Sequence, residues 1–148
     1  MTTLKALALV AALALPGAAQ AWEEPARGTE LRGDLMDALR PMAEWDLGAP
    51  VEFVVLDLRV AGDVAFASVM AQRPGGAPIV IQDTPFFQRG EIDPEIADGA
   101  TIQALLQRSG RMWVPVQFAI GATDVWYFYE GFCPIWGGVL TEFCGDKN

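Results

Sequence analysis

Residues 51–73 constrain the fold more than any other stretch, because they form two apolar runs separated by a glycine-containing turn. Pairing these runs as a β-hairpin across residues 61–63 brings the even-numbered positions of both strands to one face, which is predicted to be the core face. These positions hold Val54, Leu56, Leu58, Val60, Val64, Phe66, Ser68 and Met70. On the other face, Asp57 and Arg59 are expected to lie opposite two alanines, so that face should become polar toward the turn.

The first 21 residues have the pattern of a secretory signal peptide. Lys5 supplies a positive charge, residues 6–15 form a short apolar run, and residues 19–21 give an A-x-A cleavage site. The run is too short to cross a bilayer, and no later segment has the uncharged apolar length that a membrane helix needs. We therefore expect one mature domain, residues 22–148, that is periplasmic or secreted and has no membrane attachment after cleavage.

Cys133 and Cys144 are the two cysteines of the chain. In an oxidising compartment an even count predicts a disulfide, and closing this short loop would contribute about 3 kcal/mol by chain entropy. A redox-active pair would normally have the spacing C-x-x-C, whereas these two residues are much further apart. The prediction is therefore a structural disulfide that closes the C-terminal tail.

Composition and charge exclude several functions. Cleavage after Ala21 removes one lysine and no acid, which takes the net charge from −9 to −10, so nucleic acid is a poor candidate partner. The chain contains no histidine, which excludes Ser-His-Asp and Cys-His catalysis and nearly all zinc, copper and non-haem iron sites. Residues 91–98 space four acids like calcium ligands, but Ile96 stands where an EF-hand loop requires glycine. We therefore expect a solvated acidic loop, no metal site and no cofactor.

Residues 29–47 have the apolar spacing of an amphipathic helix with one face toward the sheet. Thr29 is expected to be its N-cap, and Gly48 followed by Pro50 ends the pattern. Pro41 removes a backbone donor and disfavours the α conformation at the preceding residue, which predicts either a kink or two short helices. The apolar positions are Leu31, Leu35, Ala38, Leu39 and Met42.

Residues 74–99 form a long connection, rich in proline and glycine, in which only residues 79–81 resemble a short strand. A connection of this length is typically a functional loop, a cover or a partly disordered segment. Phe86 and Phe87 favour a cover that folds down onto the domain.

Residues 100–121 are predicted to form a second hairpin around Ser109 and Gly110. A three-residue turn unites the apolar faces of its two strands. This register pairs Ile102, Ala104 and Leu106 with Phe118, Val116 and Val114. Pro115 then points away from the core, and its missing N–H indicates an edge strand or a bulge.

The tail, residues 122–148, is dense in aromatic side chains. Asp124 or Thr123 is expected to cap a short helix here. The tail is expected to pack across the mouth or the back of the sheet, whereas an exposed aromatic cluster would mark a binding surface. Its aromatic residues are Trp126, Tyr127, Phe128, Tyr129, Phe132, Trp136 and Phe143.

The helix and the hairpins do not alternate along the chain, which indicates an α+β fold. We predict an N-terminal helix packed on a curled antiparallel sheet of about four strands, with an aromatic, disulfide-closed C-terminal tail. The stretches LGAPVEFVVLDLRVAGDVAFASV and ALLQRSGRMWVPVQFAIGATDV resemble small exported bacterial domains of the cystatin-like and nuclear-transport-factor-like folds. The resemblance covers residues 29–126, and its most recognisable parts are the hairpin tip at residues 60–66 and the corner at residues 120–125. It implies a curled sheet that grips a helix, with the tail as an addition.

Two better-known relatives of these folds imply opposite functions. Cystatin inhibitors insert a hairpin tip of pattern Q-x-V-x-G into cysteine proteases, and residues 58–62 here keep the valine and the glycine but lack the glutamine. Ketosteroid-isomerase-like enzymes use an aspartate base with tyrosine or acid donors inside a cone-shaped pocket. Their catalytic residues match no motif of this chain.

Carboxylate, tyrosine, lysine and arginine chemistry remains available to a chain without histidine. Candidate catalytic residues are Asp57 and Asp124 as general bases, with Tyr127 as a donor. Candidate binding residues are Arg59, Arg73, Trp113 and Trp126. Five of these residues also have a structural interpretation: solvated strand charges for Asp57 and Arg59, a surface strand end for Arg73, a helix cap for Asp124 and packing for Tyr127.

The absence of a catalytic constellation favours an exported, non-catalytic domain that binds a small apolar ligand or a protein partner. The alternative is an isomerase- or hydrolase-like enzyme with an aspartate base in a cone-shaped pocket. A further alternative is a protease inhibitor that acts through the tip at residues 58–62.

Overall fold

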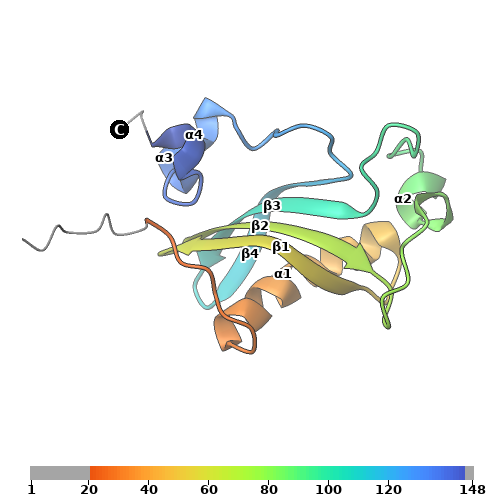
Figure 1. The fold of residues 1–148 in the computed structure, drawn as a ribbon, viewed down its shortest axis with the longest axis horizontal. Coiled ribbons are helices and arrows are strands. Elements are labelled where there is room, and N and C mark those ends of the chain that lie inside the picture. Colours follow the sequence, from red (N-terminus) through yellow and green to blue (C-terminus); the bar gives the residue numbers. More distant parts are fainter. Residues whose placement is uncertain (1–20, 146–148) are drawn as a thin grey trace, which may run out of the picture.

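The computed structural model describes residues 21–145, so residues 1–20 of the predicted signal peptide lie outside the described residues. Helix α1 packs on one face of a four-stranded antiparallel sheet, and the C-terminal segment lies on the other face (Figure 1). The strands follow one another in the order β1-β2-β3-β4, which confirms the predicted α+β fold of one helix and two hairpins. The helices are α1 (Glu30–Leu47), α2 (Pro85–Gln88), α3 (Cys133–Trp136) and α4 (Thr141–Cys144), the 3-10 turns are η1 (Ile81–Asp83) and η2 (Glu130–Phe132), and the strands are β1 (Glu52–Ala61), β2 (Val64–Gln72), β3 (Thr101–Ser109) and β4 (Met112–Ile120).

Helix α1 is one continuous helix rather than two short ones. Thr29 caps its start by accepting a hydrogen bond of 3.4 Å from the backbone N–H of Arg32, and Gly48, with a φ of 80°, follows its last turn. Pro41 lies inside the helix on its exposed side, where the loss of one backbone hydrogen bond leaves the packing face intact. That face is fully buried and consists of Leu35, Leu39, Ala43 and Leu47.

The first hairpin has a different register from the predicted one. Gly62, with a φ of 59°, opens a turn of two residues instead of three, and such turns favour glycine at their first position. Arg59 therefore lies opposite Phe66, and Asp57 lies opposite Ser68. The predicted alanine partners were wrong.

A β-bulge at Leu56 changes which side chains of β1 face the helix. The side chains packed on the helix side are Phe53 and Val55 before the bulge, and Leu58 and Val60 after it. Val54 and Leu56 are instead 41% and 57% exposed. The predicted even-numbered core face is thus confirmed for the second half of β1 and wrong for the first half, because the extra residue inverts the alternation. It was also wrong for β2, where the odd-numbered Ala65, Ala67 and Val69 pack on the helix side and Phe66 lies on the opposite side.

The second hairpin repeats this arrangement. Gly110, with a φ of 62°, opens a two-residue turn, and a bulge in β4 lies opposite Leu105 and Leu106. The predicted three-residue register was wrong, and Pro115 lies opposite Leu106 instead of pointing away from the core. Strand β4 is nevertheless an edge strand with a bulge beside the proline, as the missing N–H indicated.

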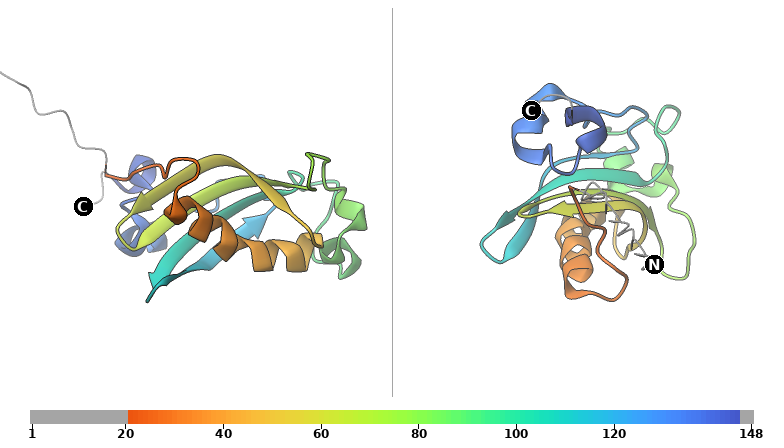
Figure 2. Two further views of the ribbon diagram at one scale, coloured as in Figure 1. Left: turned by 90° about the horizontal axis from the view of Figure 1, so that it is seen from below. Right: turned by 60° about the vertical axis from the view of Figure 1, so that its left-hand side comes forward.

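Helix α1 covers one face of the sheet, and the C-terminal helices cover one end of the other face (Figure 2). On the helix side, the small side chains of Ala65, Ala67 and Ala71 of β2 are buried together with larger residues of β1, β3 and β4. On the opposite side, Phe66 and Leu105 form an apolar floor under residues 126–144, which we call the aromatic cap. The predicted packing of the tail against the sheet is therefore confirmed.

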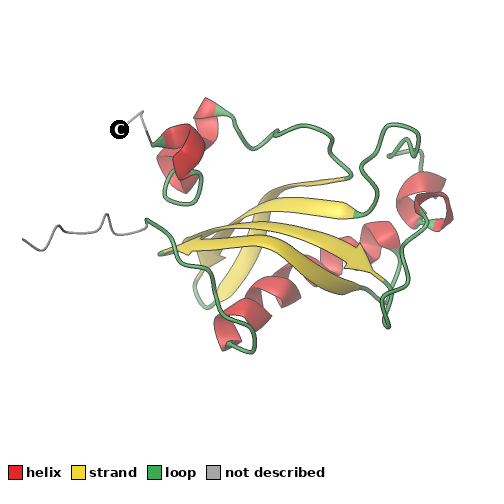
Figure 3. Cartoon of the chain, viewed as in Figure 1, coloured by secondary structure: helices red, strands yellow, loops and turns green. Residues whose placement is uncertain are grey.

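The connection at residues 74–99 is a cover over one end of the sheet (Figure 3). Phe86 packs against the helix-side core as predicted, whereas Phe87 stays exposed. Residues 79–81 do not form a strand, although Ile79 and Ile81 are buried. Among the helices of residues 21–145, none combines the length and the apolar character needed to cross a bilayer.

Arg73 holds the end of α1 against the end of β2. Its guanidinium donates hydrogen bonds to the carbonyl oxygens of Leu47 at 2.7 Å, of Pro50 at 3.1 Å and of Gly48. The last carbonyls of a helix lack partners within the helix, and a nearby cation satisfies them and opposes the helix dipole. Arg73 is therefore engaged with backbone, so it is not free to hold an anion.

We expect Arg73→Met to lower the free energy of unfolding by about 2 kcal/mol, because it removes hydrogen bonds from a charged donor. Urea unfolding followed by circular dichroism measures this loss. Arg111→Met is the matched control, since Arg111 is exposed and has no ion pair among residues 21–145. Equal losses in the two variants would contradict the role given to Arg73.

Candidate functional site

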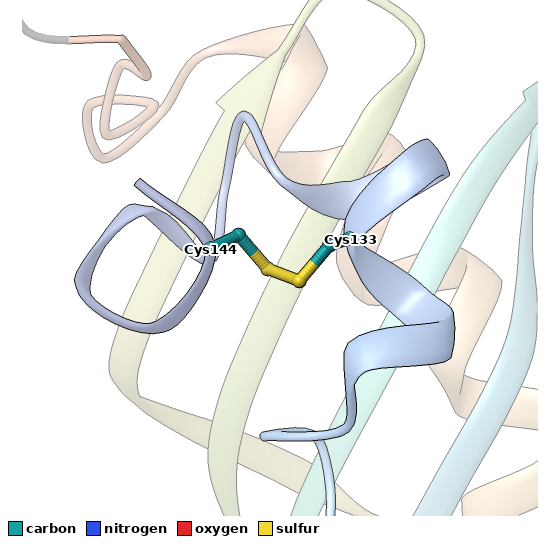
Figure 4. Close-up of a disulfide and its surroundings, with 2 residues drawn as sticks. All are labelled: Cys133 and Cys144. Carbon is teal, nitrogen blue, oxygen red and sulfur yellow. A yellow bond between two sulfur atoms is a disulfide. The ribbon is translucent and has the colours of Figure 1, made fainter. Parts of the chain in front are cut away.

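The aromatic cap is held closed by the predicted disulfide, which is confirmed. Cys133 begins α3 and Cys144 ends α4, and their Cα atoms are 5.5 Å apart (Figure 4). Helices of four residues are not stable by themselves, so this crosslink and the packing on the sheet define the cap. The predicted helix cap at Thr123 or Asp124 was wrong, because residues 122–129 contain no helix and η2 begins only at Glu130.

Aromatic side chains attach the cap to the floor of the sheet. The ring of Tyr127 lies 4.6 Å from that of Phe66. Trp136 is buried and donates from Nε1 to the carbonyl oxygen of Leu106 at 2.9 Å. Trp126 donates from Nε1 to Oε1 of Gln103 at 3.2 Å. Each indole N–H thus has an acceptor on β3, so the two tryptophans orient the cap as well as filling space.

Arg59 connects the cap to β1. Its guanidinium binds the carboxylate of Asp57 at 2.6 Å, the carboxylate of Glu142 at 2.7 Å and the carbonyl oxygen of Val139 at 3.1 Å. The rings of Trp22 and Phe66 lie 5.0 and 5.5 Å from its central carbon. The expectation of solvated strand charges was therefore wrong for Arg59, whose side chain is only 15% exposed.

These contacts keep Arg59 charged. Burial lowers the pKa of the guanidinium, but hydrogen bonds to Asp57 and Glu142 outweigh burial and raise the pKa above its usual value. Two carboxylates and a carbonyl take most of its N–H groups. Little donor capacity remains for an external anion.

The other candidate binding residues do not gather around a common space. Trp113 is buried in the helix-side core on β4, whereas Trp126 packs in the cap on the opposite face of the sheet. Arg73 lies at the end of α1, as described above. Arg59 binds Glu142 of the aromatic cap and Trp126 belongs to the cap, but neither side chain lines any of the hollows described among residues 21–145.

The candidate catalytic residues are also apart. Asp57 is bound by Arg59, and Asp124 is exposed in a bend after the sheet. Tyr127 packs on Phe66, and burial raises the pKa of its phenol, with Arg59 opposing this shift and Glu142 adding to it. Surface hollows within residues 21–145 lie beside both ends of the sheet and along both of its edges, and none of these three side chains lines them.

An exposed apolar edge lies on the second hairpin, where no functional residue was predicted except the buried Trp113. Strand β4 carries no charged residue, and four of its apolar side chains are exposed, from 39% at Val114 to 69% at Met112. We call these side chains, together with Arg108 and Arg111 near the turn, the hairpin surface. It follows the edge of the sheet and includes both faces, because Val114 pairs with Gln107 whereas Phe118 pairs with Ala104 of the helix-side core. Its apolar members are Met112, Val114, Val116 and Phe118.

The two arginines of the hairpin surface are unlike most arginines of the domain. Arg108 and Arg111 are exposed and make no ion pair or side-chain hydrogen bond within residues 21–145, although Arg108 stacks 6.0 Å from the Trp113 ring. A hollow of about 390 Å³ lies between Arg108, Val114 and Val116. The hairpin surface thus combines apolar side chains with available positive charge on an acidic protein.

No protein-family model, curated protein or solved structure matches the chain. Its function is therefore inferred from the chemistry of the described surface. The sequence contained a signal for the hairpin surface. Pro115 indicates that residues 112–120 form an edge strand, and these residues contain no charge, so the edge they form is apolar.

We expect Arg59→Met to loosen the cap and to lower the free energy of unfolding by about 2 kcal/mol, because two carboxylates lose their shared partner. Near-ultraviolet circular dichroism of the packed aromatic residues should weaken in parallel. Arg59→Lys keeps the charge but cannot bridge the same acceptors, so it should restore only part of the loss. Full recovery with lysine would contradict a role for guanidinium geometry.

The raised pKa of Tyr127 predicts a loss of stability in alkali. The folded state holds the phenolic proton more tightly than the unfolded chain, so this contribution is complete below the ordinary pKa of 10.0 and is lost as the pH rises through the folded value. In Tyr129→Phe, Tyr127 is the remaining tyrosine of the two, and absorbance of tyrosinate should give a higher midpoint in the native protein than in urea. Coincident midpoints would contradict the burial of this phenol.

Proposed function

We propose that the mature chain is a non-catalytic domain, periplasmic or secreted, that binds a protein partner through the hairpin surface. The observation that carries this proposal is the exposure of four apolar side chains on one uncharged edge strand, beside two arginines that make no ion pair among residues 21–145. Exposed apolar patches with a polar rim are characteristic of protein interaction sites. The disulfide supports an oxidising compartment.

A protein partner is favoured over a small apolar ligand. Helix α1 fills the helix side of the sheet, and the aromatic cap packs on Phe66 and Leu105 of the opposite side. Hollows with volumes of about 240 to 390 Å³ lie at the surface of residues 21–145. Small-molecule sites usually enclose most of their ligand, and none of these hollows does so.

Charge favours a foreign partner over a second copy of the chain. The net charge of the mature chain, −10 after removal of Lys5, causes copies to repel one another. Arg108 and Arg111 instead suit a partner whose apolar contact surface has acidic groups at its rim. Such a partner would surround the edge strand, because Val114 and Phe118 lie on opposite faces of the sheet, and it would neutralise the two exposed arginines.

The alternative functions have less support from the geometry. An aspartate-based enzyme needs its base and its donor in one pocket, and Asp57, Asp124 and Tyr127 lie apart. An inhibitor needs a free tip, but Val60 exchanges two backbone hydrogen bonds of 2.9 Å with Glu23, and a Cβ at Gly138 would lie 3.1 Å from Ala61. The N-terminal segment and the cap therefore flank residues 58–62.

A photo-crosslinking amino acid placed at Met112 in the full chain, expressed in a host that exports it, tests the proposal. The matched control is the same group at Ile96, which is similarly exposed but lies in the acidic loop. We expect one protein adduct of defined mass at position 112 and none at position 96. With the partner purified, Val116→Glu should weaken binding about tenfold or more, because it places a charge in an apolar contact.

Other results would overturn the proposal. Adducts of equal yield at both positions, or unaltered affinity of Val116→Glu, would exclude the hairpin surface. A small molecule that native mass spectrometry finds bound to the mature chain and that is lost on denaturation would favour the ligand alternative.

A further inference from the structure

The edge of β1, at the opposite end of the strand order from the hairpin surface, is open over a short stretch. The N-terminal segment covers the last residues of β1, where Glu23 of the segment pairs with Val60 of the strand. Pro25 cannot extend this pairing because it lacks an N–H, and its carbonyl oxygen instead accepts a hydrogen bond from Arg32. At the start, the backbone of Val51 is occupied by Arg40 and Glu44. The open stretch therefore lies between Val51 and the bulge at Leu56.

The register shows which backbone groups of this stretch point outward. The N–H of Ala71 donates to the carbonyl of Ala100, so Ala71 bonds toward β3 and away from β1. Its partner on β1 is Phe53, and in an antiparallel ladder a pair without mutual hydrogen bonds directs its groups away from each other. The N–H and C=O of Phe53 thus face the open edge, and those of Val55, two residues later, do the same.

A groove runs beside these outward groups. It has a volume of about 360 Å³ and lies between β1 and the beginning of α1. Met36, Phe53 and Val55 supply apolar side chains, all of them partly buried against the helix-side core. Such a groove between an edge strand and a helix is the geometry in which extended peptides add a strand to a sheet.

Two cations line the same groove. Arg32 is engaged with Pro25 and has Glu24 at 3.9 Å. Arg27 is exposed and has no ion pair or side-chain hydrogen bond within residues 21–145. An available arginine beside open backbone groups suits a peptide that carries a carboxylate.

We infer that this groove is a docking site for an extended segment of a partner protein that has an apolar side chain followed by a carboxylate. The segment pairs with Phe53 and Val55, seats its apolar side chain against Met36, and places its carboxylate at Arg27. The inference goes beyond the proposed function, since β1 and β4 are opposite edges of the sheet.

The probe is a synthetic peptide, acetyl-TVTVD, added to the full mature chain and followed by amide NMR. We expect shifts and slowed hydrogen exchange at the amides of Phe53 and Val55. A peptide of the same sequence with methylated backbone nitrogens should not bind, because it cannot form the ladder. No binding of acetyl-TVTVD at millimolar concentration, or equal binding of the methylated peptide, would overturn the inference.

Two protein variants test the role of charge. Arg27→Gln should weaken binding about tenfold, the loss expected for one charge-assisted hydrogen bond. Gln82→Glu is the matched control, because it makes the same change in net charge at an exposed site in η1, and its affinity should be unaltered. Equal loss of peptide affinity in the two variants would show that only net charge matters, and it would overturn the proposed site. A dimer in light scattering that protects Phe53 and Val55 without peptide would overturn it as well, by assigning the groove to a second copy.

Discussion

The side chain of Arg59 joins three parts of the domain: strand β1, the N-terminal segment and the aromatic cap. It extends from β1, lies against Trp22 of the N-terminal segment, and binds Glu142 and a carbonyl of the cap. The cap consists of turns too short to be stable alone, so its position depends on this guanidinium, on the disulfide and on the aromatic contacts with Phe66 and Leu105. A planar cation with several fixed donors is suited to this bridging role.

Much of the fold could be predicted from local signals. Thr29 and Gly48 mark the ends of α1, glycines mark both hairpin turns, and the cysteine pair marks the cap. The strand registers could not be predicted in the same way. Val54 and Leu56 are apolar although they are exposed, so β1 lacks the clean alternation that would place its side chains on one face. A bulge adds one residue at a point where the sequence shows only another apolar side chain, and this happens at Leu56 and near Val116.

The candidate site could be predicted less well than the fold. Sequence interpretation selected residues by chemical type, and the structure engages several of them in internal contacts: Arg59 in the cap, Arg73 at the end of α1, and Trp113 in the core. Val114, Val116 and Phe118 of the hairpin surface were assigned to the core face because they are apolar, yet all three are exposed. Trp113 and Val114 are neighbours on one strand, yet they lie on opposite faces, and only the three-dimensional register decides which of them is covered.

The two bulges affect how readily the domain aggregates at high concentration. An exposed edge strand is a template along which another molecule can polymerise, and long flat apolar edges cause aggregation. Here each edge strand is interrupted near its middle by a bulge, and β4 also lacks a donor at Pro115. Neither edge offers a continuous ladder of strand length. The chain can therefore expose an apolar edge without forming the indefinite sheets that lead to fibrils.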